Sequence, residues 1–450
     1  MRHVTILGAG LTGPLLALYL ARRGYRVDVY EQRPDPRVHG FLGGRSINLA
    51  LSDRGIRALA GARVDEDVLK DAIAMKGRMI HDLEGNTDLQ PYSRTGRHIN
   101  SIARGGLNIT LANAAEYHEE VLFHFDHACV DVDLARRTIR LKRGDGVEME
   151  REVDLLIAAD GANSVLRRAM EEGLDGFTAE TEWLSHGYKE LEIPPGAHGA
   201  FLLETHALHI WPRHDFMMIA LPNPDATFTC TLFAPMEGPD GFASIVSDDD
   251  VRSYFERYFP DALPLMPTLI DDWHANPTSR LGTLFCAPWH VGDWACLVGD
   301  AAHAIVPFYG QGMNAGFEDC VVLNEVLDEH GDDDWGDVLR EFYLRRKKNT
   351  DAIARLAVTN FVEMRSKVVD EKFLWKKRLD AALADMFPDR WAPLYEMVTF
   401  SSIPYADAME RSARQDALLD AIGYEEVERA IGEGRGRVEE VLFAREKNEG

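Results

Sequence analysis

A strand, a glycine-rich turn, a helix and a second strand follow one another in the first 31 residues of this 450-residue chain. The β-branched run at 3–8 (HVTILG) leads into a GxGxxG pattern at Gly8, Gly10 and Gly13, then into PLLALYLARRGY and RVDVYE, which ends at Glu31. Glycines there permit a tight turn, close approach of a pyrophosphate and close helix–strand packing, and the glutamate can accept hydrogen bonds from ribose hydroxyls. The sequence therefore predicts a doubly wound α/β domain that binds a dinucleotide.

Two later segments carry further signals of the same kind. The segment ADGANSVLRR places Asp160 at a strand-to-helix turn. The segment GDAAHAIVPFYGQGMNAGFEDC places Asp300 after an apolar strand and begins a helix near Gly312, Met313 and Asn314. Asp300 can hold a second ribose or ribityl hydroxyl, and the positive end of the helix suits negative charge on the pyrimidine part of a reduced flavin. With the long interval between the motifs, these features indicate FAD rather than NAD.

The order of the segments predicts an α/β fold with three parts. The first is a discontinuous, Rossmann-like FAD-binding domain made of residues 1–75, 104–180 and 287–335. The second is a substrate domain, for which short β-rich runs broken by Pro, Gly and Asn predict an antiparallel sheet, at residues 76–103 and 181–286. The third is a helical C-terminal region, residues 336–450, whose last fifty residues we expect to be a mobile terminus.

Charge and cysteine content exclude several classes of protein. The chain has 49 Lys+Arg against 74 Asp+Glu, a formal net charge of −25, so neither nucleic acid nor a membrane is an expected partner. Its five cysteines form no CxxC pair, which predicts reduced thiols and no metal site. We find no leader before the first strand and no apolar run long enough to span a bilayer, and we expect a soluble, cytoplasmic protein. The sequence leaves the oligomeric state, monomer or homodimer, open.

Longer strings carry a family resemblance. In their order along the chain, the GxGxxG turn, the DG turn and the GDAAH loop resemble the single-component flavoprotein aromatic hydroxylases of the para-hydroxybenzoate hydroxylase fold. The similarity is closer in GRSINLALSDRG (44–55), RMIHDLEG (78–85), HGYKELEIPP (186–195), LHIWPRHDFMMIALPN (208–223), FTCTLFAP (228–235), NFVEMR (360–365) and PLYEMVTFS (393–401). These strings resemble the kynurenine 3-monooxygenase family.

The resemblance implies hydroxylation of L-kynurenine to 3-hydroxy-L-kynurenine through a flavin 4a-hydroperoxide, a reaction of tryptophan catabolism and NAD biosynthesis. It implies tightly but non-covalently bound FAD, with NADPH and O₂ as co-substrates, and no side chain acting as acid or base. Substrate positioning is expected from Arg78, Tyr92, Asn360 and Tyr395. Cofactor contacts are expected from Gly8, Gly10, Gly13, Glu31, Gln32, Arg33, Ala50, Arg104, Asp160, Asp300, Gly312, Met313 and Asn314.

The chemistry of these residues fits an aromatic amino acid. Arg78 shares a strand face with Ile80 and offers a bidentate partner to a carboxylate. Asn360 lies in the apolar stripe of a helix, where a buried amide must find partners, so it is either a structural hydrogen-bond hub, which the pattern alone favours, or a substrate contact. The remaining pocket residues are expected to be Ile210, Ile219, Leu221, Phe233, Pro307, Phe308, Gln311 and Glu363.

Two other functions stay open from the sequence. One is a flavin hydroxylase of a different aromatic acid, and the other is a non-catalytic FAD-binding module that senses redox state. Flavin halogenases share the fold, but the chain has no WxWxIP string. His303 lies near the expected flavin loop, where a buried structural histidine is the commoner interpretation.

Overall fold

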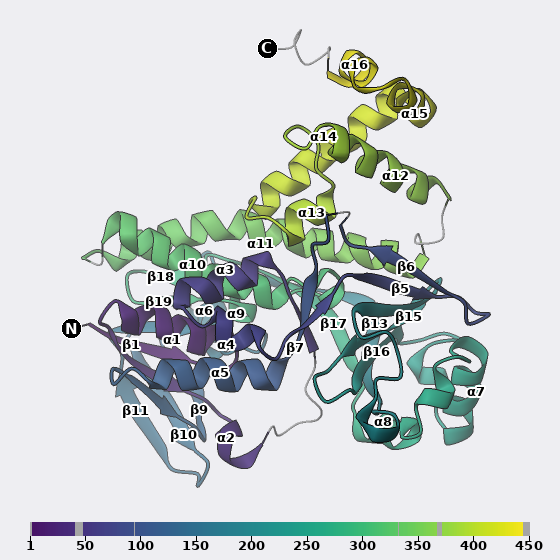
Figure 1. Cartoon of the computed structure of the whole chain (residues 1–450). Helices are drawn as coiled ribbons and strands as arrows, with labels where there is room; N and C mark the ends of the chain where they lie inside the picture. The colour runs from purple at the N-terminus through teal and green to yellow at the C-terminus, as the bar shows by residue number, and fades with distance from the viewer. Residues whose placement is uncertain (1, 41–47, 94, 332, 367–370, 444–450) are drawn as a thin grey trace.

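The computed structural model describes residues 2–40, 48–93, 95–331, 333–366 and 371–443 (Figure 1). Strand β1 (His3–Leu7), helix α1 (Thr12–Arg22) and strand β2 (Arg26–Tyr30) form the predicted βαβ unit. They belong to a six-stranded sheet in the order β18-β19-β12-β1-β2-β8. The other strands of this sheet are β8 (Val121–His124), β12 (Leu155–Ala158), β18 (His290–Val291) and β19 (Ala295–Leu297). Segments far apart in the sequence thus build one sheet, although the predicted domain boundaries themselves stay a prediction.

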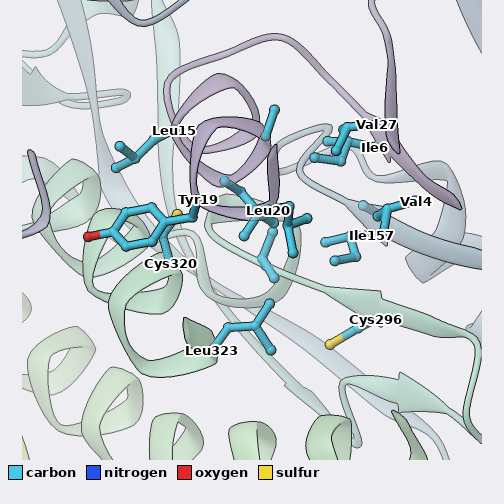
Figure 2. Packing of buried hydrophobic residues seen from close by; sticks show 14 of the residues in the cluster. Val4, Ile6, Leu15, Tyr19, Leu20, Val27, Ile157, Cys296, Cys320 and Leu323 are labelled. Atoms are coloured by element: carbon cyan, nitrogen blue, oxygen red, sulfur yellow. The ribbon is translucent and has the colours of Figure 1, made fainter. Parts of the chain in front are cut away.

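Helix α1 is buried along most of its length because the sheet covers one side and two helices cover the other. Those helices are α5 (Arg104–Glu116) and α10 (Gly312–His330). Figure 2 shows Leu20 of α1 between the strand residues and Leu323 of α10, with Tyr19 beside Cys320. All five cysteines are free, and all but Cys129 are buried.

Smaller elements surround this sheet. A three-stranded sheet, β3-β7-β4, joins two strands that precede the first predicted substrate segment with one from the end of that segment, and a second three-stranded sheet has the order β11-β10-β9. Their bounds are β3 (Asn48–Leu51), β4 (Ile73–Met75), β7 (Ile99–Ala103), β9 (His127–Asp133), β10 (Thr138–Arg143) and β11 (Glu148–Glu152). The helices here are α2 (Pro36–His39), α3 (Asp53–Ala62), α4 (Asp65–Leu69), α6 (Val165–Gly173) and α9 (Asp300–His303).

The predicted substrate sheet has seven strands in the order β17-β13-β16-β15-β14-β5-β6. These are β5 (Gly77–His81), β6 (Thr87–Pro91), β13 (Thr178–Ile193), β14 (Ala207–Arg213), β15 (Phe216–Pro222), β16 (Phe228–Pro235) and β17 (Ser279–Ala287). Its outer face carries α7 (Asp248–Tyr258) and α8 (Leu269–Ala275), as Figure 1 shows.

The prediction of a wholly antiparallel substrate sheet is wrong at one place. β5 runs parallel to β14, with Arg78 opposite Leu208 and Ile80 opposite Ile210. The remaining neighbouring pairs of this sheet are antiparallel. β5 belongs to an earlier segment of the chain than β14, and apolar alternation within a strand reveals its faces but not its direction.

The prediction of a mobile terminus is wrong as far as residue 443. Beyond the long α11 (Trp335–Ser366), helices α12 (Glu371–Met386), α13 (Leu394–Thr399), α14 (Tyr405–Ile422), α15 (Tyr424–Glu433) and α16 (Arg435–Val438) pack above the rest of the chain (Figure 1). Their shared apolar cluster includes Leu383, Trp391 and Leu419. No one of these helices displays a long apolar stripe in the sequence. Their ordered packing is therefore explained only by the apolar cluster that they form together. Residues 444–450 lie outside the described part of the chain.

Membrane-spanning helices and metal-binding groups are both absent from the described residues. None of the helices in the described ranges combines the length and hydropathy needed to cross a bilayer. No group of three His, Cys, Asp or Glu side chains in those same ranges is placed to hold a metal ion.

A buried pair of histidines joins β5 to β14 on the sheet face opposite Arg78. His81 Nδ1 lies 2.8 Å from Asp261 Oδ2, and His81 Nε2 lies 2.9 Å from His209 Nδ1. His209 Nε2 lies 2.8 Å from the carbonyl oxygen of Glu204, which can only accept, so this nitrogen carries a proton. Burial lowers the pKa of His209 to about 4.

We expect this burial to make stability depend on pH. Between the ordinary pKa of 6.5 and the folded value of about 4, the unfolded chain protonates His209 and the folded protein does not. The free energy of unfolding should therefore be largest above pH 6.5 and fall by at most about 3 kcal/mol on the way to pH 4. Urea unfolding at pH 7.5 and 5 measures the difference. His209→Gln should reduce it, whereas His330→Gln, at an exposed position, should leave it unchanged; an equal loss in both variants would contradict the assignment.

Candidate active site

The glycine-rich turn after β1 has one position that is open to a ligand. At Gly8, φ is +94°, and a Cβ would lie 2.5 Å from the carbonyl oxygen of Ala159. A Cβ on Gly13 would overlap the carbonyl oxygen of Gly8. A Cβ on Gly10 would meet no atom of the described chain within 4 Å. Packing therefore requires glycine at two positions, and the third leaves the backbone accessible to a group such as a pyrophosphate.

Glu31 is buried at the end of β2 and is oriented by two backbone donors. Its Oε2 accepts a hydrogen bond from Ala9 N (2.9 Å), and its Oε1 accepts one from Arg33 N (2.9 Å) and lies 3.2 Å from Arg33 Nε. Asn108 of α5 supports the same turn by donating to the carbonyl oxygens of Ala9 (2.8 Å) and Gly10 (2.6 Å). Gln32 and Arg33 are exposed beside it. Asn108 was not predicted, because a single asparagine in a helix gives no sequence signal of a distant partner.

The other two segments that the sequence predicts to bind the dinucleotide lie at the same edge of the sheet. Asp160 follows β12, and its Oδ2 accepts from Val165 N (2.8 Å). Its Oδ1 is buried and has no hydrogen-bond partner among the residues that the structure describes, and burial raises the pKa of Asp160. Asp300 is exposed as the first residue of α9 after β19. Since β1, β12 and β19 are parallel neighbours, the three motifs meet beyond their carboxyl ends.

The start of α10 is held by the side chain of Asn314. Its Oδ1 accepts from Ser52 N (3.0 Å), and its Nδ2 donates to the carbonyl oxygens of Ala50 and Gly310 (2.8 Å each). This fully buried side chain is therefore used by the protein itself, and only backbone N–H groups at the helix start remain for a ligand. Gly312 begins the helix, Met313 and Ala50 are half-buried, and Arg104 is exposed at the start of α5.

His303 has the structural role that the sequence favoured. Its Nε2 lies 2.7 Å from Asp319 Oδ2, which also accepts from Gly299 N (2.8 Å). Arg346 Nε lies 2.6 Å from the other oxygen of Asp319. Burial alone would raise the pKa of Asp319, but His303 and Arg346 outweigh burial and lower it. The ionised carboxylate thus fixes the loop that leads to α10.

A second cluster surrounds Arg78 on β5. The Arg78 guanidinium carbon lies 4.9 Å from the ring centre of Tyr395 and 5.6 Å from that of Tyr92, and the two rings stack at 5.3 Å. Arg78 is 8% exposed and forms no ion pair with a carboxylate in the described part of the chain. Its Nε and the Tyr92 hydroxyl are buried without a hydrogen-bond partner there. A buried cation without a counter-ion is costly, so this arrangement points to an anionic ligand.

Most of the predicted apolar wall lies in two adjoining clusters. Ile210, Phe233 and Phe308 are buried in one cluster, and Leu221 packs with Tyr92 in the other. Ile219 packs against both. Pro307 is exposed, because it begins a 3-10 turn whose next residue points inward, and it is not brought to the wall.

Asn360 and its helical neighbour Glu363 approach this wall from α11. Asn360 Nδ2 donates to the carbonyl oxygen of Phe308 (2.6 Å), which is the hub role that the pattern favoured. The side chain of Lys377 on α12 is exposed at the surface, but partial desolvation by the surrounding protein lowers its pKa to about 8. The positive charge of Arg78 lowers this pKa further, and the negative charge of Glu363 opposes the shift. Lys377 was not predicted, since nothing local distinguishes it from the other charges of α12.

Comparison with known proteins identifies the family. The family described as FAD binding domain matches residues 1–349. The sequence is 44% identical over 444 residues to kynurenine 3-monooxygenase of Myxococcus xanthus (strain DK1622), which covers 98% of this chain and 93% of that protein. It is 44% identical over 420 residues to kynurenine 3-monooxygenase of Flavobacterium johnsoniae, with 93% of each covered. The chain belongs to the kynurenine 3-monooxygenase family.

Solved structures share the fold at lower identity. 2-Methyl-3-hydroxypyridine-5-carboxylic acid oxygenase superposes with a TM-score of 0.65 at 21% identity, over 90% of this chain and 97% of that one. p-Nitrophenol 4-monooxygenase from Pseudomonas putida DLL-E4 gives 0.63 at 19% identity, over 86% and 95%. The predicted α/β fold of flavoprotein hydroxylases is thereby confirmed.

The geometry of the glycine turn separates folding from cofactor binding. Gly10→Ala should fold with a Tm close to that of the parent and lose most FAD, because the added methyl group meets no protein atom and fills the space for the ligand. Gly13→Ala should lose both stability and FAD, because its methyl group overlaps Gly8. Thermal melting and FAD content measured by absorbance check this, with Gly432→Ala on α15 as a control that changes neither. Retention of FAD by Gly10→Ala would contradict the assignment.

Proposed function

We propose that this chain hydroxylates L-kynurenine to 3-hydroxy-L-kynurenine, using FAD, NADPH and O₂. The single observation that carries the proposal is Arg78, a buried guanidinium with no carboxylate partner in the described residues, flanked by stacked tyrosines and an apolar wall. Such a site suits a ligand that has a carboxylate at one end and an aromatic ring at the other. Membership of the kynurenine 3-monooxygenase family supports the same substrate.

The cofactor site fits FAD on its own geometry. The open position at Gly10 admits a pyrophosphate, and Glu31 and Asp300 would hold hydroxyl groups at either end of an extended dinucleotide. The unpartnered Oδ1 of Asp160 is a further acceptor at this edge. The redox chemistry, acceptance of hydride from NADPH and activation of O₂, is supplied by FAD when it is bound.

The side chains of this chain bind, orient and exclude water. Arg78 would donate two parallel hydrogen bonds to the kynurenine carboxylate, and the hydroxyls of Tyr92 and Tyr395 would donate to the same group. The wall formed by Ile210, Phe233 and neighbouring residues would hold the ring in one orientation and keep water out. We assign no general acid or base, because positioning is the contribution that this arrangement offers.

Two other functions predict different behaviour with reductant. A hydroxylase of another aromatic acid would bind FAD but show no response to kynurenine. A non-catalytic FAD module would show slow reduction whatever aromatic acid is present. Anaerobic stopped-flow reduction by NADPH, with and without kynurenine, distinguishes the proposed function from both: we expect kynurenine to accelerate reduction of the flavin at least tenfold. Equal rates in both conditions would overturn the proposed substrate.

The Arg78 site gives a sharper test. Arg78→Ala should keep bound FAD and raise the Kd for kynurenine by roughly 100-fold or more, because a charge-assisted bidentate interaction is lost. Spectral titration of the oxidised flavin with kynurenine measures this. Arg280→Ala is a matched control, since Arg280 of β17 also stacks on an aromatic ring, that of Trp183 at 4.5 Å, but its side chain is exposed. Unchanged affinity in Arg78→Ala would rule out the carboxylate assignment.

We also infer a cytoplasmic location and an enzyme that acts without a membrane or nucleic-acid partner. The net charge of −25 supports this, because it disfavours anionic surfaces. Fractionation of cells, with the full-length chain recovered in the soluble fraction, is the measurement that checks it. Light scattering would distinguish the monomer from the homodimer.

A further inference from the structure

A buried hydrogen bond connects the C-terminal helices to the loop before α10. Tyr405, the first residue of α14, is fully buried, and its hydroxyl lies 2.9 Å from Gln311 Oε1. Ser52 Oγ lies 3.5 Å from the same oxygen. Gln311 is 2% exposed and directly precedes Gly312, the first residue of α10. Tyr405, from the C-terminal region, thus contacts the side-chain amide of Gln311 at the start of α10, the helix expected to face the flavin.

The ring of Tyr405 is held in place by Arg54 of α3. The guanidinium carbon of Arg54 lies 3.9 Å from the ring centre, and its Nη1 lies 2.6 Å from Glu318 Oε1. Arg54 Nε donates to the carbonyl oxygen of Val398 (3.0 Å), and Nη2 donates to that of Ile403. These bonds, to α10, to α13 and to the segment before α14, hold the guanidinium in place. The Tyr405 ring that stacks on it is therefore held in a single orientation.

The protons in this contact fix the direction of the Gln311 amide. Burial raises the pKa of Tyr405 far above its ordinary value, so the hydroxyl keeps its proton. The acceptor it meets in the described part of the chain is Gln311 Oε1. A reversed amide would present Nε2 to Tyr405 and leave the buried hydroxyl hydrogen without an acceptor, which is costly. Oε1 therefore faces α14, and Nε2 faces the other way, with no partner among the described residues.

We propose that Tyr405 is a positioning residue that acts through Gln311. By holding Oε1, it presents the Nε2 group of Gln311 as a hydrogen-bond donor to a carbonyl oxygen of a group bound in the active site. This inference rests on the proposed function for the identity of that group, since both the ketone of kynurenine and the pyrimidine ring of FAD offer such an oxygen. Nothing in the reaction requires Tyr405 to touch the substrate itself.

A double-mutant cycle tests whether Tyr405 acts through Gln311. Tyr405→Phe, Gln311→Ala and the double variant are compared with the parent protein. Two binding constants are measured: the Kd of the apo-protein for FAD by quenching of FAD fluorescence, and the Kd of the holoenzyme for kynurenine by flavin absorbance. The fraction of NADPH that ends as hydrogen peroxide is measured as well.

We expect Tyr405→Phe to raise one of the two Kd values by roughly threefold to tenfold, as loss of an oriented hydrogen bond does. A rise in the Kd for kynurenine assigns the carbonyl to the substrate, and a rise in the Kd for FAD assigns it to the flavin. In the Gln311→Ala background, Tyr405→Phe should add no further change. Unchanged constants, or an equal change in both backgrounds, would overturn the proposal.

Two further variants separate positioning from folding. Tyr254→Phe removes the hydroxyl of another buried tyrosine, on α7, which has no hydrogen-bond partner in the described residues, and it should change neither constant. If Tyr405→Phe does not fold, as thermal melting would show, Ser52→Ala should shift the same constant in the same direction by a smaller factor, and no shift would overturn the proposal. The FAD measurement uses no substrate, so absence of kynurenine-dependent NADPH oxidation in the parent protein would reject the proposed function without deciding the role of Tyr405.

Discussion

Two arginines and two carboxylates, buried between α3, α10 and α11, hold the site together. Arg346 Nη1 lies 2.5 Å from Glu318 Oε2, and Arg54 lies on the other oxygen of the same carboxylate. Arg346 also reaches Asp319, which binds His303 and the backbone of Gly299. Opposite charges compensate one another in this interior, but removal of one member would leave a buried charge unpaired, which costs about 3–5 kcal/mol. The loop that leads to α10 therefore depends on this electrostatic balance as well as on the apolar packing of Val306 and Phe308.

Local patterns in the sequence were sufficient for the part of the fold that binds the dinucleotide. The glycine pattern of the turn from β1 to α1 is readable within a few residues. A Cβ on Gly13 would overlap the neighbouring Gly8, whereas the glycine at position 8 is required by the distant Ala159. Arg78 was also foreseeable, since alternation along a short strand places it on the same face as Ile80. In both cases a pattern within a few residues of the sequence was enough to reveal the position.

What escaped the sequence depends on contacts between distant segments. Asn314 was expected to contact the cofactor, but its side chain is fully hydrogen-bonded to the backbone of Ser52, Ala50 and Gly310. This arrangement exists only in the folded chain. Asn108 reaches the glycine turn from a helix whose own sequence gives no sign of that contact. The packing of α14 to α16 arises from several short helices that share one apolar cluster, and no single segment carries that information.

The parallel pairing of β5 with β14 has a consequence for how the substrate side could be separated from the rest. Residues 181–286 look like a self-contained sheet in the sequence, yet β5 and β6 enter that sheet from a segment that precedes it by about a hundred residues. A fragment cut at 181 would lack Arg78 and would leave β14 as an unpaired edge that carries Ile210 and Trp211. Open apolar edges of this kind recruit other strands and aggregate. The strand that brings the guanidinium to the pocket is thus also the strand that closes the sheet, so binding and solubility are inherited from the same five residues.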